Sequence, residues 1–518
     1  MSERVNRSLM NIKVGIFFYI ISVLLSFFSR RIFLEFLGKE FIGLIGMLSN
    51  ILDYLSVAEL GIGTSIIYFL YKPIQANDHK KINEVISMLA FLYLCIGLII
   101  GGVGIAISMF FPFWFDNLNI GLPLVYFTFY AFLAQSMSGY IINYRQLLLS
   151  ASQKQYVISA YFQTIGIIQS VLQIALAYFW HNLYVWVIVG LIFTVIGCII
   201  LNIRIRKEYP WLSVNIMAGR KMLHLYPEIL KKTRQVFTLK IKDLVLYRSD
   251  ELLVGAFVSV SHVALFGNYT MIINKLIYIV NILADGMSAG VGNLIAEGNK
   301  KNIMKVFWEM TATRFFIMGM VIFPLLMFIQ PTICCWVGSQ YLLSTLIVYL
   351  LIINLFLRLQ YITVNMFVVA SGLYDDVWTN WCELAINLTV TLALAPHLGI
   401  VGILFGKILS VFFFNVFWKP YYLFNRGFHE NVSVYWHGMM PYFFIFFLFA
   451  VISILLKFFI IDYIELNLIS LIGIGLAIVP LLLTLYFLTL FTCTKGMKYF
   501  VARKQSVYHL LNKFTRGI

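Results

Sequence analysis

Four basic side chains within apolar stretches could together bind an anion. Arg30 and Arg31 stand near the end of the first long apolar stretch, whereas Arg248 and Lys275 lie in two later ones. A charge inside a bilayer is costly and normally faces protein or a water-filled cavity. Guanidinium groups bind phosphate through paired hydrogen bonds, and an ammonium group adds a point charge. These four residues therefore predict a phosphate-binding site; the alternative for Arg30 and Arg31 is snorkelling to the outer membrane interface.

Acidic side chains in the same kind of sequence could bind a coupling ion. Glu59 and Asp285 each follow an alanine and closely precede glycine, in AELGIG and ADGMSAG. A carboxylate buried in a membrane can carry a proton or bind Na⁺. Asp250 and Glu251 are further candidates for ion coupling. For Glu59 and Asp285 the alternative is a hydrogen bond to a neighbouring helix. For the four basic residues it is an internal ion pair, such as Arg248 with Asp250 or Glu251.

The composition is that of a membrane protein. Of the 518 residues, 61% are hydrophobic, whereas soluble domains are typically about half apolar. Apolar stretches of about 20 residues recur from end to end of the chain. The net charge of +16 does not indicate a nucleic-acid partner, because the basic residues alternate with these stretches. We therefore predict an all-α polytopic membrane protein.

The apolar stretches predict fourteen membrane-spanning helices, with breaks marked by Lys-Pro at 72–73, Phe-Pro at 111–112, Gln-Pro at 330–331 and Ala-Pro at 395–396. They are expected at about 12–36, 42–71, 83–111, 122–149, 155–180, 183–203, 236–259, 262–296, 303–329, 342–370, 376–396, 398–424, 439–461 and 467–493.

The basic residues predict the orientation of these helices. With the N-terminus inside, the outer loops hold only Lys39 and Lys457. Lysine and arginine accumulate on the cytoplasmic side of membrane proteins, so both termini are predicted to be cytoplasmic. The inner segments then hold Arg4, Arg7, Lys13, Lys72, Lys80, Lys81, Arg145, Lys154, the cluster 204–242, Lys300, Lys301, Lys305, Lys419, Arg426 and the tail from Lys495.

A repeat divides the chain into two halves. Gly46 and Gly267 occupy matching places at an offset of 221 residues, and the pairs Lys80-Lys81 and Lys300-Lys301 match at 220. Two packed halves are typical of transporters, which rock around a shared central site. The predicted parts are an N-lobe at 1–207, a cytoplasmic linker loop at 208–235, a C-lobe at 236–426, helices 13 and 14 at 427–494, and a basic, amphipathic cytoplasmic tail at 495–518.

The remaining reactive residues do not form a recognisable enzyme site. All eight histidines fall in loops, at helix ends or in the tail, and the six cysteines have no CxxC spacing. Neither a P-loop nor a nucleophile motif is present in the sequence. The sequence therefore predicts no catalytic residue, no metal site and no cofactor apart from a coupling H⁺ or Na⁺, and the chain is not expected to be an enzyme.

Two segments resemble the bacterial polysaccharide flippases. LGKEFIGLIGMLSNILDYLSVAELGIGTSIIYFLYKPI (37–74) is similar to their opening helix pair, and SDELLVGAFVSVSHVALFGNY (249–269) to their seventh-to-eighth-helix signature. These are the O-antigen and capsule repeat-unit (Wzx-type) exporters of the multidrug/oligosaccharidyl-lipid/polysaccharide (MOP) superfamily. The span number and the half-repeat agree with this family, and the resemblance covers nearly the whole chain.

The resemblance implies two six-helix lobes forming a V around a cationic cavity, with two extra C-terminal helices. It implies transport by alternating access of an undecaprenyl-diphosphate-linked oligosaccharide across the bacterial cytoplasmic (inner) membrane, for capsule or lipopolysaccharide biosynthesis. Arg30, Arg31, Arg248 and Lys275 would bind the diphosphate, although Lys275 stands where an Arg is expected. Membrane lipids and other polysaccharide assembly proteins are the implied partners.

Two alternatives belong to other functional classes. A multidrug or cation antiporter of the same superfamily would favour an acidic cavity, whereas the opening helices here are rich in cations. A membrane polysaccharide polymerase or ligase would need sizeable outer loops for catalysis, whereas the predicted outer loops are short.

Overall fold

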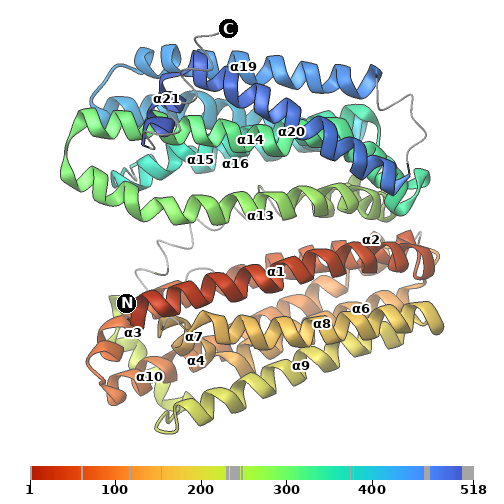
Figure 1. The fold of residues 1–518 in the computed structure, drawn as a ribbon. Coiled ribbons are helices and arrows are strands. Elements are labelled where there is room, and N and C mark those ends of the chain that lie inside the picture. Colours follow the sequence, from red (N-terminus) through yellow and green to blue (C-terminus); the bar gives the residue numbers. More distant parts are fainter. Residues whose placement is uncertain are drawn as a thin grey trace. The chain divides into compact units, whose positions relative to one another are not determined.

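The fold is seen in a computed structural model, in which every regular element of the described residues is a helix (Figure 1). The described residues are 3–59, 62–115, 118–152, 154–228, 233, 246, 249–373, 375–376, 378–459 and 467–503. The chain divides into two compact units, Met1–Ala264 and Leu265–Ile518. The sequence repeat instead predicts a second lobe beginning at 236, and that assignment stays a prediction.

The first unit is built from long helices joined by short ones. Its described elements are α1 (Glu3–Phe36), α2 (Lys39–Leu55), the 3₁₀ helix η1 (Ser56–Glu59), α3 (Ile62–Gln75), α4 (His79–Ser108), α5 (Phe111–Trp114), α6 (Leu122–Asn143), α7 (Gln146–Ala151), α8 (Gln155–Phe179), α9 (Leu183–Glu208), α10 (Ile216–Leu225) and α12 (Asp250–Phe257).

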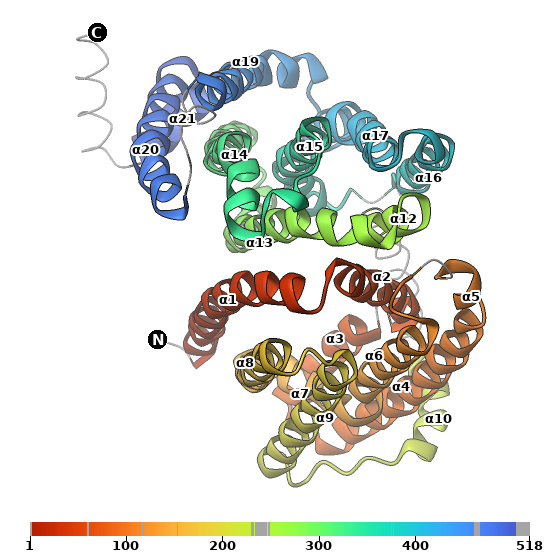
Figure 2. The ribbon, with the colours of Figure 1, turned by 90° about the vertical axis from the view of Figure 1, so that its right-hand side faces the viewer.

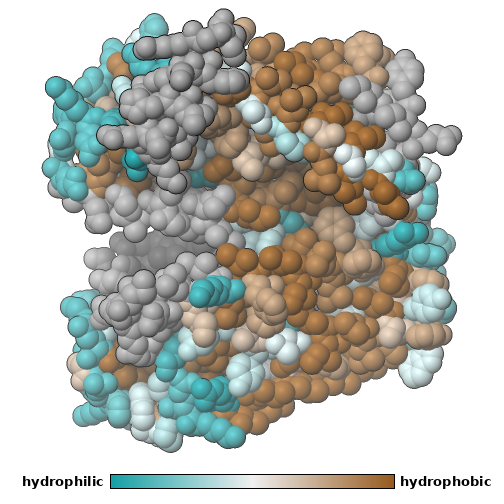
Figure 3. Space-filling view, viewed as in Figure 1, coloured by the Kyte–Doolittle hydropathy of each residue, from teal (hydrophilic) through white to brown (hydrophobic). Residues whose placement is uncertain are grey.

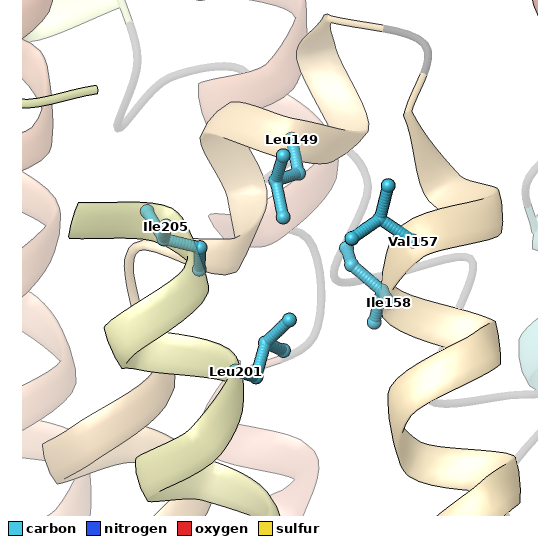
Figure 4. Close-up of a cluster of buried hydrophobic side chains, with 5 residues drawn as sticks. All are labelled: Leu149, Val157, Ile158, Leu201 and Ile205. Atoms are coloured by element: carbon cyan, nitrogen blue, oxygen red, sulfur yellow. The ribbon is translucent and has the colours of Figure 1, made fainter. Parts of the chain in front are cut away.

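Packing in the first unit places α8 between α1 and α9, while α6 lies against α4 and α9 (Figures 1 and 2). Near one end of α8 and α9, the apolar side chains of Leu149, Val157, Ile158, Leu201 and Ile205 point toward one another (Figure 4). These five side chains are buried. Their mutual packing holds α7, α8 and α9 together at that end.

The second unit begins within α13 (Val260–Glu297). Its further described elements are α14 (Lys300–Val337), η2 (Ser339–Tyr341), α15 (Thr345–Ala370), α16 (Trp378–Leu398), α17 (Ile400–Val411), the π-helical segments η3 (Phe412–Trp418) and η4 (Leu423–Phe428) flanking α18 (Lys419–Tyr422), α19 (Val432–Phe459), α20 (Leu468–Cys493) and α21 (Lys495–Ala502).

Helix α14 is the centre of the second unit, because α15, α19, α20 and α21 all pack against it (Figure 2). A buried ion pair joins two other parts of this unit: the Lys419 Nζ lies 2.7 Å from an Asp376 carboxylate oxygen. Asp376 lies in the short segment 371–376, which carries no lysine or arginine, and its charge is thus paired with a lysine from α18.

Ten described helices are long and apolar enough to cross a membrane. In Figure 3, hydrophobic side chains cover the middle of the helices and hydrophilic ones gather toward their ends, as expected for helices embedded in lipid. The predicted span at 236–259 lies largely outside the described residues, and its described part is α12. The helices continue past two of the expected breaks: α14 runs through Pro331 to Val337, and α16 runs through Pro396 to Leu398, two residues beyond the predicted end of that span. Packed membrane helices tolerate such prolines because neighbouring groups satisfy the freed carbonyls.

The second predicted span, 42–71, is a broken helix. Helix α2 ends at Leu55, η1 follows to Glu59, and α3 starts at Ile62. Irregular backbone at membrane depth is tolerated where it is buried in protein or lines a cavity. Glu59 therefore lies beside a helix break, which is the kind of position at which discontinuous membrane helices form binding sites.

The predicted linker loop contains a docked helix. Helix α10 packs on α4, and a Cβ added at Gly219 would lie 2.1 Å from the Ser87 carbonyl oxygen. The Ser213 and Asn215 amides donate to Asn83 and to the Ser87 hydroxyl at 3.1 Å each. A loop was expected because this segment is polar; the close approach that glycine permits and these side-chain acceptors explain its order.

The Tyr226 side chain predicts a pH dependence of this docking. Its hydroxyl donates to Glu84 at 2.7 Å, and burial followed by this hydrogen bond raises the pKa of Tyr226 from 10.0 to about 12. A raised pKa adds stability that is complete below pH 10 and is lost as the pH rises through about 12. Relative to Tyr226→Phe, we expect the wild type to have the higher melting temperature below pH 10, with the gap closing toward pH 12. The exposed Tyr71→Phe is the control, and a gap independent of pH would contradict this role.

Candidate functional site

Two glycine-lined helices bring the predicted ion-coupling residue Glu251 against α2. A Cβ added at Gly43 would lie 1.9 Å from the Val260 carbonyl oxygen, and one added at Gly255 would lie 2.2 Å from the Met47 sulfur. At position 43 only glycine allows α2 to approach the backbone at the start of α13, whereas Gly255 leaves room for the Met47 side chain of α2. These two glycines therefore determine how closely α2 packs against α12 and the start of α13.

The Glu251 carboxylate is held by a neutral polar residue of α2. The Asn50 Nδ2 donates to a Glu251 carboxylate oxygen at 2.9 Å and to the Gly46 carbonyl at 2.8 Å. Glu251 stands in the first turn of α12, where the helix dipole favours negative charge. Glu251 thus has a hydrogen-bond donor on α2, and its role in ion coupling stays a prediction. Asp250 precedes it in the same turn and is half-buried.

The predicted cationic set is only partly described. Arg30 is half-buried on α1, and its Nη2 donates to the Ala264 carbonyl at 3.0 Å. Arg31 follows it and is exposed. Lys275 is half-buried on α13 in the second unit, whereas Arg248 lies outside the described residues. The joint phosphate site therefore stays a prediction.

The Glu59 carboxylate is set beside two tyrosines. The Tyr93 hydroxyl of α4 donates to a Glu59 carboxylate oxygen at 2.6 Å. Tyr140 of α6 packs edge-on against Tyr93, with ring centroids 5.5 Å apart. The Glu59 side chain is half-buried, so it is partly accessible from outside the protein. The matching residue Asp285 lies in α13, and its side chain lies outside the described residues.

The sequence interpretation missed three neutral polar residues at these sites. Asn50, Tyr93 and Tyr140 all stand in apolar stretches, where the search was limited to charged groups. The signal that could have found them is a neutral hydrogen-bonding side chain at membrane depth, which needs a partner there. Within the described part of the chain, no group of three histidine, cysteine or acidic residues could hold a metal ion.

No protein-family model and no curated protein matches the chain. Among solved structures, it is similar to the lipid II flippase MurJ in an inward closed conformation, with a TM-score of 0.61 and 13% identity, over 92% of this chain and 99% of that one. It is also similar to an inward-facing multidrug resistance transporter of the MATE family in the MOP superfamily, with a TM-score of 0.53 and 14% identity, over 75% of this chain and 92% of that one.

These likenesses establish the class of fold. The chain is an all-α, multi-pass membrane protein with the helical fold of the MOP transporters, which confirms the predicted fold class. At 13% and 14% identity the likeness extends to the fold alone.

Proposed function

We propose that this chain is a flippase that moves an undecaprenyl-diphosphate-linked oligosaccharide repeat unit across the bacterial cytoplasmic membrane by alternating access. The observation that carries the proposal is the extent of the fold match. The likeness to a lipid II flippase runs over 92% of this chain, whereas the likeness to a multidrug transporter leaves a quarter of it unmatched. The cations on α1 and α13 support an anionic substrate.

Reconstitution tests the proposed activity. The purified chain is placed in vesicles that contain a fluorescent undecaprenyl-diphosphate-linked oligosaccharide, and the fraction reached by an external quencher is followed in time. Under an H⁺ or Na⁺ gradient, we expect the protein to move fluorescent substrate from the inner to the outer leaflet, where the quencher reaches it. Unchanged protection, together with efflux of a cationic dye from the same vesicles, would favour the antiporter alternative. In cells, deletion should trap lipid-linked repeat units on the cytoplasmic side.

Single substitutions test the proposed diphosphate contacts. Replacing Arg30, Arg31, Arg248 or Lys275 by alanine removes a charged donor, and a hydrogen bond to a charged group contributes about 1.5–3 kcal/mol, or about tenfold or more in affinity. We expect flipping of the diphosphate-linked substrate to fall by about tenfold at equal protein level where the side chain contacts it. The flipping rate should fall less in Arg30→Lys than in Arg30→Ala, because lysine keeps the charge but loses the paired hydrogen bonds.

The matched control for these substitutions is Arg206→Ala, at the exposed end of α9. It removes a guanidinium of the same kind far from the proposed contacts along the sequence. Normal transport by all four alanine variants would rule out the phosphate clamp, whereas equal losses in the control would indicate a nonspecific effect of net charge.

We further propose that Glu59 couples this transport to an ion gradient. The Glu59 carboxylate accepts a hydrogen bond from Tyr93 at a helix break and is half-buried. Such a carboxylate can take up and release a proton. Transport driven by a pH gradient with Na⁺ absent would support H⁺, and transport that requires Na⁺ would support the alternative ion.

A further inference from the structure

A cavity of about 940 Å³ lies within the second unit, where α14, α19 and α21 begin. Helix α21 packs against α14 beside it (Figure 1). The volume of the cavity is at the upper end of the range for small-molecule sites. Three candidate membrane spans, Lys300–Val337, Val432–Phe459 and Ile469–Cys493, have an end at this place. The cavity therefore lies at the depth of a membrane–water interface, whichever side that end faces.

The walls of the cavity are cationic. Lys300, Lys301, Lys305 and Lys495 line it against one carboxylate, Glu430. Among the described residues, none of these lysines forms an ion pair. The helix N-termini of α14 and α21 add positive potential at the same place, since their first residues line the cavity.

A neighbouring glutamate does not neutralise these lysines. Glu309 is buried on α14, and its carboxylate pairs with the guanidinium of Arg503, just after α21. This ion pair also clamps α21 onto α14. A Cβ added at Gly496 would lie 2.1 Å from the Trp308 carbonyl oxygen, so close packing fixes the α21 backbone at the cavity.

The wall of the cavity includes a buried aromatic pair. The Tyr442 side chain is 2% exposed, and its ring stacks parallel to that of Trp308 with centroids 6.3 Å apart. Its hydroxyl is buried and lies near Thr494 and the Gly496 backbone. The cationic groups that a ligand can reach are therefore the exposed lysines.

Exposed apolar side chains stand on two of the helices that line the cavity. Val434, Met440 and Phe444 of α19 and Phe500 of α21 are exposed, and α21 carries basic and apolar residues together. A soluble anion would need only the lysines, whereas this apolar margin suits acyl chains.

We propose that this cavity binds the phosphate headgroup of an anionic membrane phospholipid, with the lysines around the phosphate. The site is separate from the proposed diphosphate contacts and does not depend on the transport activity. Free phosphate shares the headgroup chemistry, so the experiment distinguishes the two sources.

Native mass spectrometry of the delipidated full chain in detergent tests the proposal with three probes: dioleoylphosphatidylglycerol, dioleoylphosphatidylcholine and inorganic phosphate. We expect phosphatidylglycerol to bind at least about tenfold more tightly than phosphatidylcholine, because several lysines contact its net charge. Millimolar inorganic phosphate should not displace it. Equal affinity for the two lipids, or displacement by phosphate, would overturn the assignment to an anionic lipid.

Substitutions of the residues that line the cavity test whether phosphatidylglycerol binds there. Lys300→Gln/Lys301→Gln/Lys495→Gln should weaken phosphatidylglycerol binding by about tenfold or more, whereas the matched pair Lys80→Gln/Lys81→Gln at the start of α4 should not. Lys305→Gln alone should weaken it by about threefold or more, so it decides the question if the triple variant fails to fold. Wild-type affinity in every folded lysine variant would refute the site.

Discussion

Glu59→Gln is expected to abolish the stimulation of transport by an ion gradient while leaving the protein folded. The glutamine has nearly the same shape and its amide oxygen can still accept the Tyr93 hydrogen bond. It cannot take up or release a proton, nor supply a negative charge to Na⁺. Gradient-free exchange of substrate should stay within about twofold of wild type, because the packing at the break between α2 and α3 is kept.

The measurement compares transport with and without an imposed gradient in the same vesicles. Glu40→Gln is the matched control, since Glu40 is also a half-buried glutamate that accepts a hydrogen bond, in this case from Asn119 at 2.8 Å. Tyr93→Phe should reduce the stimulation without removing it, because the carboxylate remains. Full stimulation in Glu59→Gln would show that another group couples the ion.

Gly43→Val is expected to lower the free energy of unfolding by about 3 kcal/mol or more, because overpacking against fixed backbone costs about that much. The Cβ alone would lie 1.9 Å from the Val260 carbonyl oxygen, so α2 and the start of α13 must separate. The same movement would pull Asn50 away from Glu251 and leave that carboxylate without its 2.9 Å donor.

Reversible denaturation in detergent measures this loss. Gly102→Ala on α4 is the control, because nothing lies within 4 Å of a Cβ added there. Alanine is favoured over glycine in a helix interior, so Gly102→Ala should raise stability by about 0.5–1 kcal/mol. A neutral effect of Gly43→Val would mean that α2 and the start of α13 are not tightly packed in the membrane.

Most of the fold class could be predicted from hydropathy. The expected spans at 155–180 and 467–493 agree with α8 and α20 to within one residue at each end, because about 20 apolar residues leave a helix as the only structure that satisfies the backbone in lipid. Proline was a poorer guide, since α14 continues through Pro331 to Val337. Packing partners decide whether such a helix stops or continues.

The candidate site was less predictable. Glu59 and Glu251 were found as charges in apolar sequence, but their partners Tyr93 and Asn50 were not, because contacts between helices far apart in the chain leave no local pattern. The docking of α10 on α4 was missed for the same reason. The predicted roles of Arg30, Arg31, Arg248, Lys275, Asp250 and Asp285 remain to be tested by the substitutions above.

The assignment as a multi-pass helical membrane protein follows from the amino-acid sequence, since the cost of unpaired polar groups in lipid acts on composition alone. The folded structure was needed to show that Glu59 lies at a helix break beside Tyr93, that glycines bring α2 close to α12 and the start of α13, and that lysines from α14 and α21 line one cavity. These features depend on distances between remote segments, which are set by the packing of whole helices rather than by neighbouring residues.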